Sequence, residues 1–182
     1  MARNLKAGPV PLLDAHCDSV IQRFVRGDPT DLAVEDPDSH VDLARLRKGG
    51  VAGAFVMVGG YELAQSSKLI AAVHEMAETR PDDFALCRTQ RELRAAFAAG
   101  RFALVPTLES LAFLAEDARH LRNWRKLGAV LTTLTHGEGL TNRPGALQVD
   151  PSFFGFIAAQ DRAALLRQSK GLTPFGAEAL KL

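Results

Sequence analysis

The sequence has little cysteine, no long apolar run and almost no net charge, and each shortage excludes a class of protein. Two cysteines are too few for a disulfide framework and favour a reducing compartment. The 22 lysines and arginines nearly balance the 21 aspartates and glutamates, so a general electrostatic attraction to nucleic acid or to an acidic membrane is not expected. No apolar stretch approaches the ~20 residues that cross a bilayer, so we expect no membrane span.

The amino-terminal residues lack the pattern of a signal peptide, because Met1 to Lys6 is followed by two prolines and charge returns at Asp14. We therefore expect a cytoplasmic protein. The composition is otherwise that of an ordinary globular chain, with 47% hydrophobic and 24% charged residues among 182. This is enough for one domain, residues 1–182, with a substantial core.

Short apolar runs alternate with helical patterns along the chain. The predicted strands are Val10–Leu13, Val51–Val58, Phe102–Leu108 and Ala129–Leu134. The predicted helices are Asp42–Lys48, Lys68–Thr79, Gln90–Ala99, Glu116–Leu127, Phe153–Gln168 and a last one from Thr173-Pro174 to Leu182. Strands separated by helices indicate parallel β–α units. Four strands are half of an eight-stranded barrel, which typically needs ~250 residues, so the pattern predicts either a small open sheet or an incomplete barrel.

Several local signals refine this pattern. Asp42 has the position of a helix N-cap, and Thr89 with Glu92 has the spacing of a capping box. Pro106 is awkward for a central strand because it lacks an N–H donor. Trp124 is expected in the core.

Polar side chains follow three of the predicted strands. Asp14, His16 and Asp18 end the first, Glu109 follows the third and His136 follows the fourth. Alternate residues of a strand share a face, and catalytic groups of parallel α/β proteins gather at the carboxyl ends of strands. An imidazole with carboxylates suits a divalent ion such as zinc. The alternative is a strand-to-loop turn in which the aspartates bond the backbone.

Four segments, in order, resemble the membrane (renal) dipeptidase family of zinc peptidases, in its amino-terminal half. They are Leu13-Asp14-Ala15-His16-Cys17-Asp18, the stretch from Val41 to Val51, Leu127-Gly128 with Leu131–His136, and Gly171-Leu172-Thr173-Pro174-Phe175-Gly176. The resemblance spans nearly the whole chain. It implies an α/β fold, a partial (β/α)8 TIM-type barrel of about the first four β/α units, with the carboxyl-terminal half absent.

The resemblance also implies a chemistry. His16 and Asp18 match ligands of one zinc ion, and Glu109 matches the carboxylate that bridges two zinc ions. His136 matches a histidine that contacts the substrate and stabilises the oxyanion. Two further histidines, a substrate-binding arginine and the catalytic aspartate of the family have no counterpart in this chain, so we expect at most one ion to be held well.

Individual positions depart from the family pattern. Ser110 follows Glu109 where the family usually has glycine, and Val130 stands where arginine is common. The loop around Asn142 matches only loosely. Cys17 alternates onto the opposite face of the strand from His16, so we expect it to pack in the core and not to bind the metal. His74 is expected on a solvated helix surface.

The leading hypothesis is a zinc-dependent dipeptidase in which a metal-bridged hydroxide hydrolyses dipeptides. The alternative is a catalytically inactive half-barrel that needs a partner chain, such as a second copy, because unpaired strand edges favour association. A third reading is a small α/β domain that shares only these segments with the family.

Overall fold

The computed structural model of the chain describes residues 10–59, 62–114, 117–134 and 174–182. Its strands are β1 (Leu12–Cys17), β2 (Val51–Gly59), β3 (Phe84–Leu86), β4 (Phe102–Leu108) and β5 (Leu131–Thr132). Its helices are α1 (Ser19–Arg26), α2 (Leu43–Lys48), α3 (Leu63–Thr79), α4 (Gln90–Ala98), the 3-10 turn η1 (Ala112–Leu114), α5 (His120–Leu127) and α7 (Pro174–Ala179). The predicted helix Phe153–Gln168 lies outside the described residues. None of the described helices combines the length and apolar character needed to cross a bilayer.

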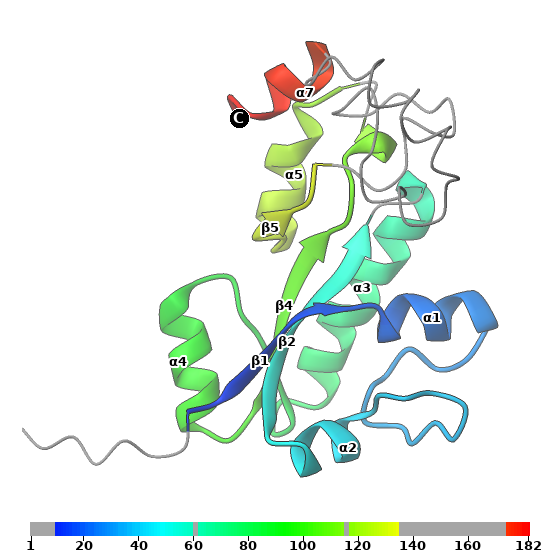
Figure 1. Cartoon of the computed structure of the whole chain (residues 1–182), viewed down its shortest axis with the longest axis vertical. Coiled ribbons are helices and arrows are strands. Elements are labelled where there is room, and N and C mark those ends of the chain that lie inside the picture. Colours follow the sequence, from blue (N-terminus) through cyan, green and yellow to red (C-terminus); the bar gives the residue numbers. More distant parts are fainter. Residues whose placement is uncertain (1–9, 60–61, 115–116, 135–173) are drawn as a thin grey trace, which may run out of the picture.

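The strands form one parallel sheet in the order β1-β2-β4-β3, with β5 also paired to β4 (Figure 1). β3 pairs with the first three residues of β4 and β5 with its last two, so both short strands lie along the same edge of β4. The sheet curls into a half-barrel, which confirms the predicted partial (β/α)8 architecture. The sequence did not indicate β3, because its apolar stretch is only three residues long.

The central strand β4 tolerates Pro106 because the neighbour along one edge of β4 changes from β3 to β5 at this residue. Pairing with β3 ends at Leu104, and pairing with β5 begins at Thr107. The Pro106 carbonyl accepts the Val130 N–H at 3.0 Å. In a parallel strand, the N–H and the C=O of one residue point toward the same neighbouring strand. An N–H at position 106 would therefore lie between the part of β4 that pairs with β3 and the part that pairs with β5, where it would have no strand partner. No ladder hydrogen bond is lost.

The strand order places α3 and α4 on opposite faces of the sheet (Figure 1). The connection that contains α3 runs from β2 across β4 to β3, and the connection that contains α4 runs back from β3 to β4. The two connections cross the sheet in opposite directions. Because both are right-handed crossovers, their helices lie on opposite faces of the sheet. Leu69 and Val73 of α3 accordingly pack in one core cluster, and Ala96 of α4 packs with Ala103 and Val105 in the other. Because residues 103, 105, 107 and 109 alternate onto one face, α4 covers the amino-terminal part of the face that carries residue 109.

The N-cap at Asp42 and the Thr89 half of the capping box are confirmed, whereas the Glu92 carboxylate accepts the N–H of Arg88, one residue before the N-cap, at 2.7 Å. The Asp42 carboxylate accepts the Arg45 N–H at 2.8 Å, and the Thr89 hydroxyl accepts the Glu92 N–H at 3.2 Å. Helix boundaries differ elsewhere: α3 begins five residues before the predicted start, and α7 ends at Ala179 instead of continuing to the last residue.

The start of α5 is later than predicted for a local reason. The Asp117 carboxylate accepts the N–H of Arg119 at 2.9 Å, two residues on, and this turn delays the helix to His120.

A buried arginine organises the connection between α1 and α2. Arg23 is 1% exposed and donates to the carbonyl oxygens of Asp31 at 2.7 Å and Val34 at 2.9 Å, and also to that of Val41. Its Nε lies 3.6 Å from a carboxylate oxygen of Asp36. The connecting segment is therefore wrapped around one guanidinium group, which also fixes the position of α1.

Replacing Arg23 with methionine is expected to lower the free energy of unfolding by about 3 kcal/mol, because buried carbonyl oxygens lose a charged donor. Urea denaturation followed by circular dichroism measures this change. Arg91→Met, on the exposed surface of α4, is the control and should change stability by less than about 0.5 kcal/mol. Equal losses in the two variants would contradict the structural role of Arg23.

Candidate metal site

One imidazole and two carboxylates meet at the carboxyl ends of β1 and β4. His16 lies in β1, Asp18 precedes α1, and Glu109 directly follows β4. The His16 Nε2 atom lies 3.4 Å from Asp18 Oδ1 and 3.5 Å from Glu109 Oε1. One donor atom from each residue falls within 4.8 Å of the others. The structure thus brings together the three residues that the sequence predicts as metal ligands.

Curvature of the sheet makes this meeting possible. β1 and β4 are not neighbours, because β2 lies between them. In a flat sheet, strands separated by one other strand are ~9.6 Å apart. The side chains of His16 and Glu109 nevertheless approach to 3.5 Å, because the half-barrel turns both toward its inner face.

The distances fit ligands of a metal ion better than a hydrogen-bonded ion pair. Charge-assisted N–H···O bonds are about 2.7–2.9 Å long, which is shorter than either separation from the His16 Nε2 atom. Two ligand atoms of a tetrahedral zinc ion, each ~2.1 Å from the metal, lie roughly 3.4 Å apart. Both separations from His16 match that spacing.

Asp18 contributes a carboxylate oxygen that makes no hydrogen bond. This atom, Oδ1, is buried. Asp18 occupies the N-cap position of α1, yet its side chain does not cap the helix, whereas the Asp42 carboxylate does cap α2. A buried carboxylate oxygen without a donor is costly, and a cation beside His16 would satisfy it. The donor set therefore fits a divalent ion.

Asp14 and Cys17 do not belong to this group. Asp14 Oδ1 accepts the His16 N–H at 3.1 Å, which is the turn interaction that the sequence offered as the alternative. Asp14 pairs with Ala54 and Cys17 with Val56, so β1 contains a bulge that breaks strict alternation. Cys17 is buried in the core as expected, and burial raises the pKa of its thiol.

A family model described as membrane dipeptidase (peptidase family M19) matches residues 3–182. The chain belongs to this family. Dipeptidase ataJ of Aspergillus terreus is 30% identical, in an alignment that covers 70% of this chain and 35% of that protein. The chain therefore spans about a third of the length of this relative.

Solved structures agree on the fold. The probable dipeptidase PvdM from Pseudomonas aeruginosa superimposes with a TM-score of 0.69 at 15% identity, over 95% of this chain and 44% of that one. A metallopeptidase from Rhodobacter sphaeroides, liganded with a phosphinate mimic of the dipeptide L-Ala-D-Ala, gives a TM-score of 0.55 at 21% identity, over 70% of this chain and 48% of that one. The chain corresponds to less than half of each.

Ser110, the residue after Glu109, has a backbone conformation that favours glycine. The φ angle of Ser110 is 77°, the left-handed region that disfavours any residue with a Cβ atom. Ser110 is 1% exposed and donates its N–H to Thr133 Oγ1 at 2.8 Å. The backbone turn at Ser110 therefore carries a conformational strain energy that glycine would not have.

The remaining predicted positions have mixed outcomes. His136 and Asn142 lie outside the described residues. Val130, at the position where the membrane dipeptidase family often has arginine, packs in the smaller core cluster. Trp124 is 3% exposed, as expected for a core residue. His74 is partly exposed, and its Nε2 lies 2.7 Å from the carbonyl oxygen of Leu127, so it connects α3 to the end of α5.

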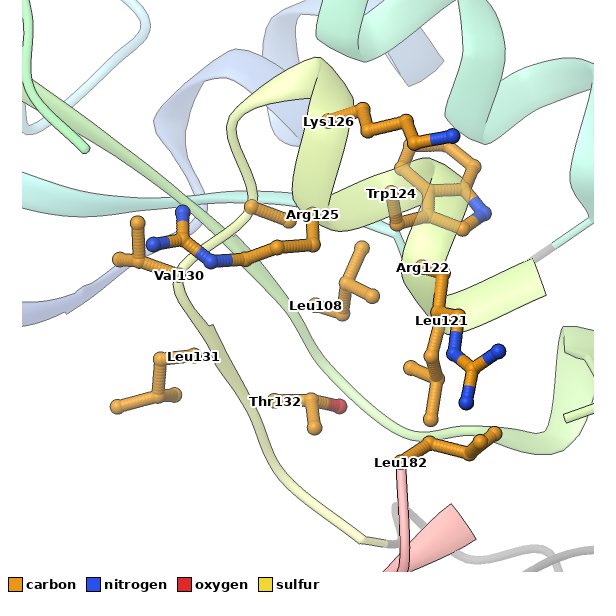
Figure 2. A pocket seen from close by; sticks show the side chains of 11 residues that line it. Leu108, Leu121, Arg122, Trp124, Arg125, Lys126, Val130, Leu131, Thr132 and Leu182 are labelled. Atoms are coloured by element: carbon orange, nitrogen blue, oxygen red, sulfur yellow. The ribbon is translucent and has the colours of Figure 1, made fainter. Parts of the chain in front are cut away.

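A groove of about 550 Å³ lies between α5, β5 and the last residue, apart from the three clustered side chains (Figure 2). Apolar side chains of Leu108, Leu121 and Trp124 form part of its lining. Leu131 and Leu182, also in the lining, are each 43% exposed. Among the described residues no strand pairs with the outer edge of β5.

The positive φ of Ser110 predicts an unusual order of stability between two variants. Ser110→Gly and Ser110→Ala both lose the hydroxyl group, so the loss of its contacts affects the free energy of unfolding of both variants equally. We expect the glycine variant to be more stable by about 1 kcal/mol, because alanine keeps the left-handed strain. Thermal or urea denaturation measures the difference. At an ordinary φ, alanine would be the more stable of the two, so that order would contradict the strained backbone.

Proposed function

We propose that this chain is a zinc-dependent dipeptidase whose first metal ion is held by His16, Asp18 and Glu109. The observation that carries the proposal is the convergence of one imidazole and two carboxylates, with a buried Asp18 oxygen that has no protein donor. Membership of the membrane dipeptidase family supports the reaction class.

Zinc suits this donor set. It accepts imidazole nitrogen and carboxylate oxygen together, and catalytic zinc sites commonly have three protein ligands and one open position. Glu109 has a second carboxylate oxygen that could bridge to another ion. A second ion needs further donors, and among the described residues no second group of three His, Cys, Asp or Glu side chains comes together. We infer that the chain holds one ion well.

When bound, a divalent ion lowers the pKa of water and polarises the scissile carbonyl. His16 and Asp18 would fix the ion at the carboxyl end of β1. Glu109 would fix it from β4, so that the ion is held from two separate strands. His136, assigned by the family resemblance, would donate a hydrogen bond where negative charge develops on the substrate.

A dipeptide is the proposed substrate. The matched fungal relative is named a dipeptidase, and the matched metallopeptidase from Rhodobacter sphaeroides is liganded with a phosphinate mimic of a dipeptide. Both support the same substrate class for the site on the inner face of this half-barrel.

A second candidate is an inactive half-barrel that is stabilised by a partner chain, such as a second copy of itself. The groove beside β5 and the exposed Leu131 and Leu182 favour it, because an open strand edge beside apolar surface promotes association. Light scattering tests this candidate. A dimer or larger assembly would support it, and a stable monomer would count against it.

The metal proposal is tested by zinc binding to the 182-residue chain. Equilibrium dialysis with Zn²⁺ should find one bound ion per chain. Glu109→Gln should lower the affinity at least tenfold, since an amide is a weaker ligand than a carboxylate. Glu75→Gln, an exposed position on α3, is the matched control and should bind as the unchanged chain does. Equal binding by all three proteins would refute the assigned ligands.

The reaction is tested separately on the same zinc-loaded protein. Release of free amino acids from a dipeptide should depend on zinc and should disappear in Glu109→Gln. Zinc binding without hydrolysis would favour the second candidate, because the metal site would then be present without the rest of the catalytic machinery.

A further inference from the structure

Both peptide groups that flank the Glu109 Cα atom are held by hydrogen bonds. On the amino-terminal side, the Glu109 N–H donates to Gly59 O at 2.9 Å, and Leu108 O accepts the Thr133 N–H at 3.0 Å. These are the last rungs of the ladders that join β4 to its neighbours. They fix the peptide that precedes the Glu109 side chain.

On the carboxyl-terminal side, the hydrogen-bond acceptor is a side chain instead of the backbone of a neighbouring strand. The chain leaves the strand direction at Ser110, whose φ is positive. The Ser110 N–H reaches the hydroxyl oxygen of Thr133 at 2.8 Å. Thr133 thus binds both sides of Glu109, through its backbone N–H to Leu108 and through its Oγ1 to Ser110.

We propose that Thr133 is a positioning residue for the metal site, because its hydroxyl fixes the peptide after Glu109 and so directs that carboxylate toward His16. Thr133 is absent from the group of three ligand residues, and it acts through Ser110. This inference rests on the proposed metal-binding function of Glu109. Groups that orient metal ligands typically affect metal affinity 10–100-fold when removed.

The Thr133 hydroxyl is removed with little change of shape in Thr133→Val, which also suits an extended backbone. Thr133→Ser keeps the acceptor and is the conservative variant. Thr107→Val is the control: the Thr107 hydroxyl is buried in β4 and contacts Val56 O at 3.2 Å and Met57 Sδ at 3.1 Å, but it makes no hydrogen bond to Ser110. Thr133→Ala removes the same acceptor with a smaller side chain and replaces the valine variant if that one does not fold.

The measurement is the Zn²⁺ dissociation constant of each full 182-residue variant, obtained by competition with a chromogenic chelator. Thermal melting without metal shows that each variant is folded. We expect about tenfold weaker binding for Thr133→Val, binding within about twofold of the unchanged chain for Thr133→Ser, and no change for Thr107→Val.

Other outcomes would overturn specific claims. Unchanged affinity in folded Thr133→Val or Thr133→Ala would overturn the positioning role and leave the metal site intact. Equal weakening in Thr107→Val would overturn it too, because general loosening of β4 would then explain the loss. No zinc binding by the unchanged chain would overturn the proposed metal site itself, and this inference with it.

Discussion

Two carboxylates and one imidazole held within 4.8 Å of one another set the constraint on which the rest of this structure depends. Like charges this close repel unless positive charge lies between them. The His16 nitrogen is too far from both carboxylates for two short hydrogen bonds, and Asp18 Oδ1 has no donor. The proposed divalent ion would offset the repulsion between the two carboxylates, and both separations from His16 are close to those between two zinc ligands.

The fold provides this arrangement with few elements. Curvature brings β1 and β4 together across β2, and the bulge in β1 directs His16 toward the site while Asp14 bonds the backbone. α4 covers the amino-terminal part of the inner face, and the candidate site lies at the carboxyl-terminal part. Arg23 fixes the segment that follows α1, the helix that Asp18 precedes. Each of these features helps to position a candidate ligand and contributes no ligand atom of its own.

The sequence predicted the three residues of the candidate site better than it predicted the contacts that hold them in position. His16, Asp18 and Glu109 stand next to apolar runs, and that local pattern, with the family resemblance, was enough to select them. The Arg23 contacts and the bond from Ser110 to Thr133 join residues separated in the chain by up to 23 positions. No local periodicity shows such pairs. β3 was missed because three residues give no periodic signal, and the early start predicted for α5 overlooked the Asp117 turn.

The candidate site and the edge of β5, with which no described strand pairs, are related by the geometry of the barrel. A barrel strand that would pair with the outer edge of β5 would also end at the carboxyl face, where His16 and Glu109 lie. A segment in that position would cover Leu131 and deliver its own end residues to the inner face. The further ligands that the family resemblance implies and the partner that the exposed edge favours are therefore expected at the same place. Whichever polypeptide pairs with β5 would be positioned to supply those further ligands.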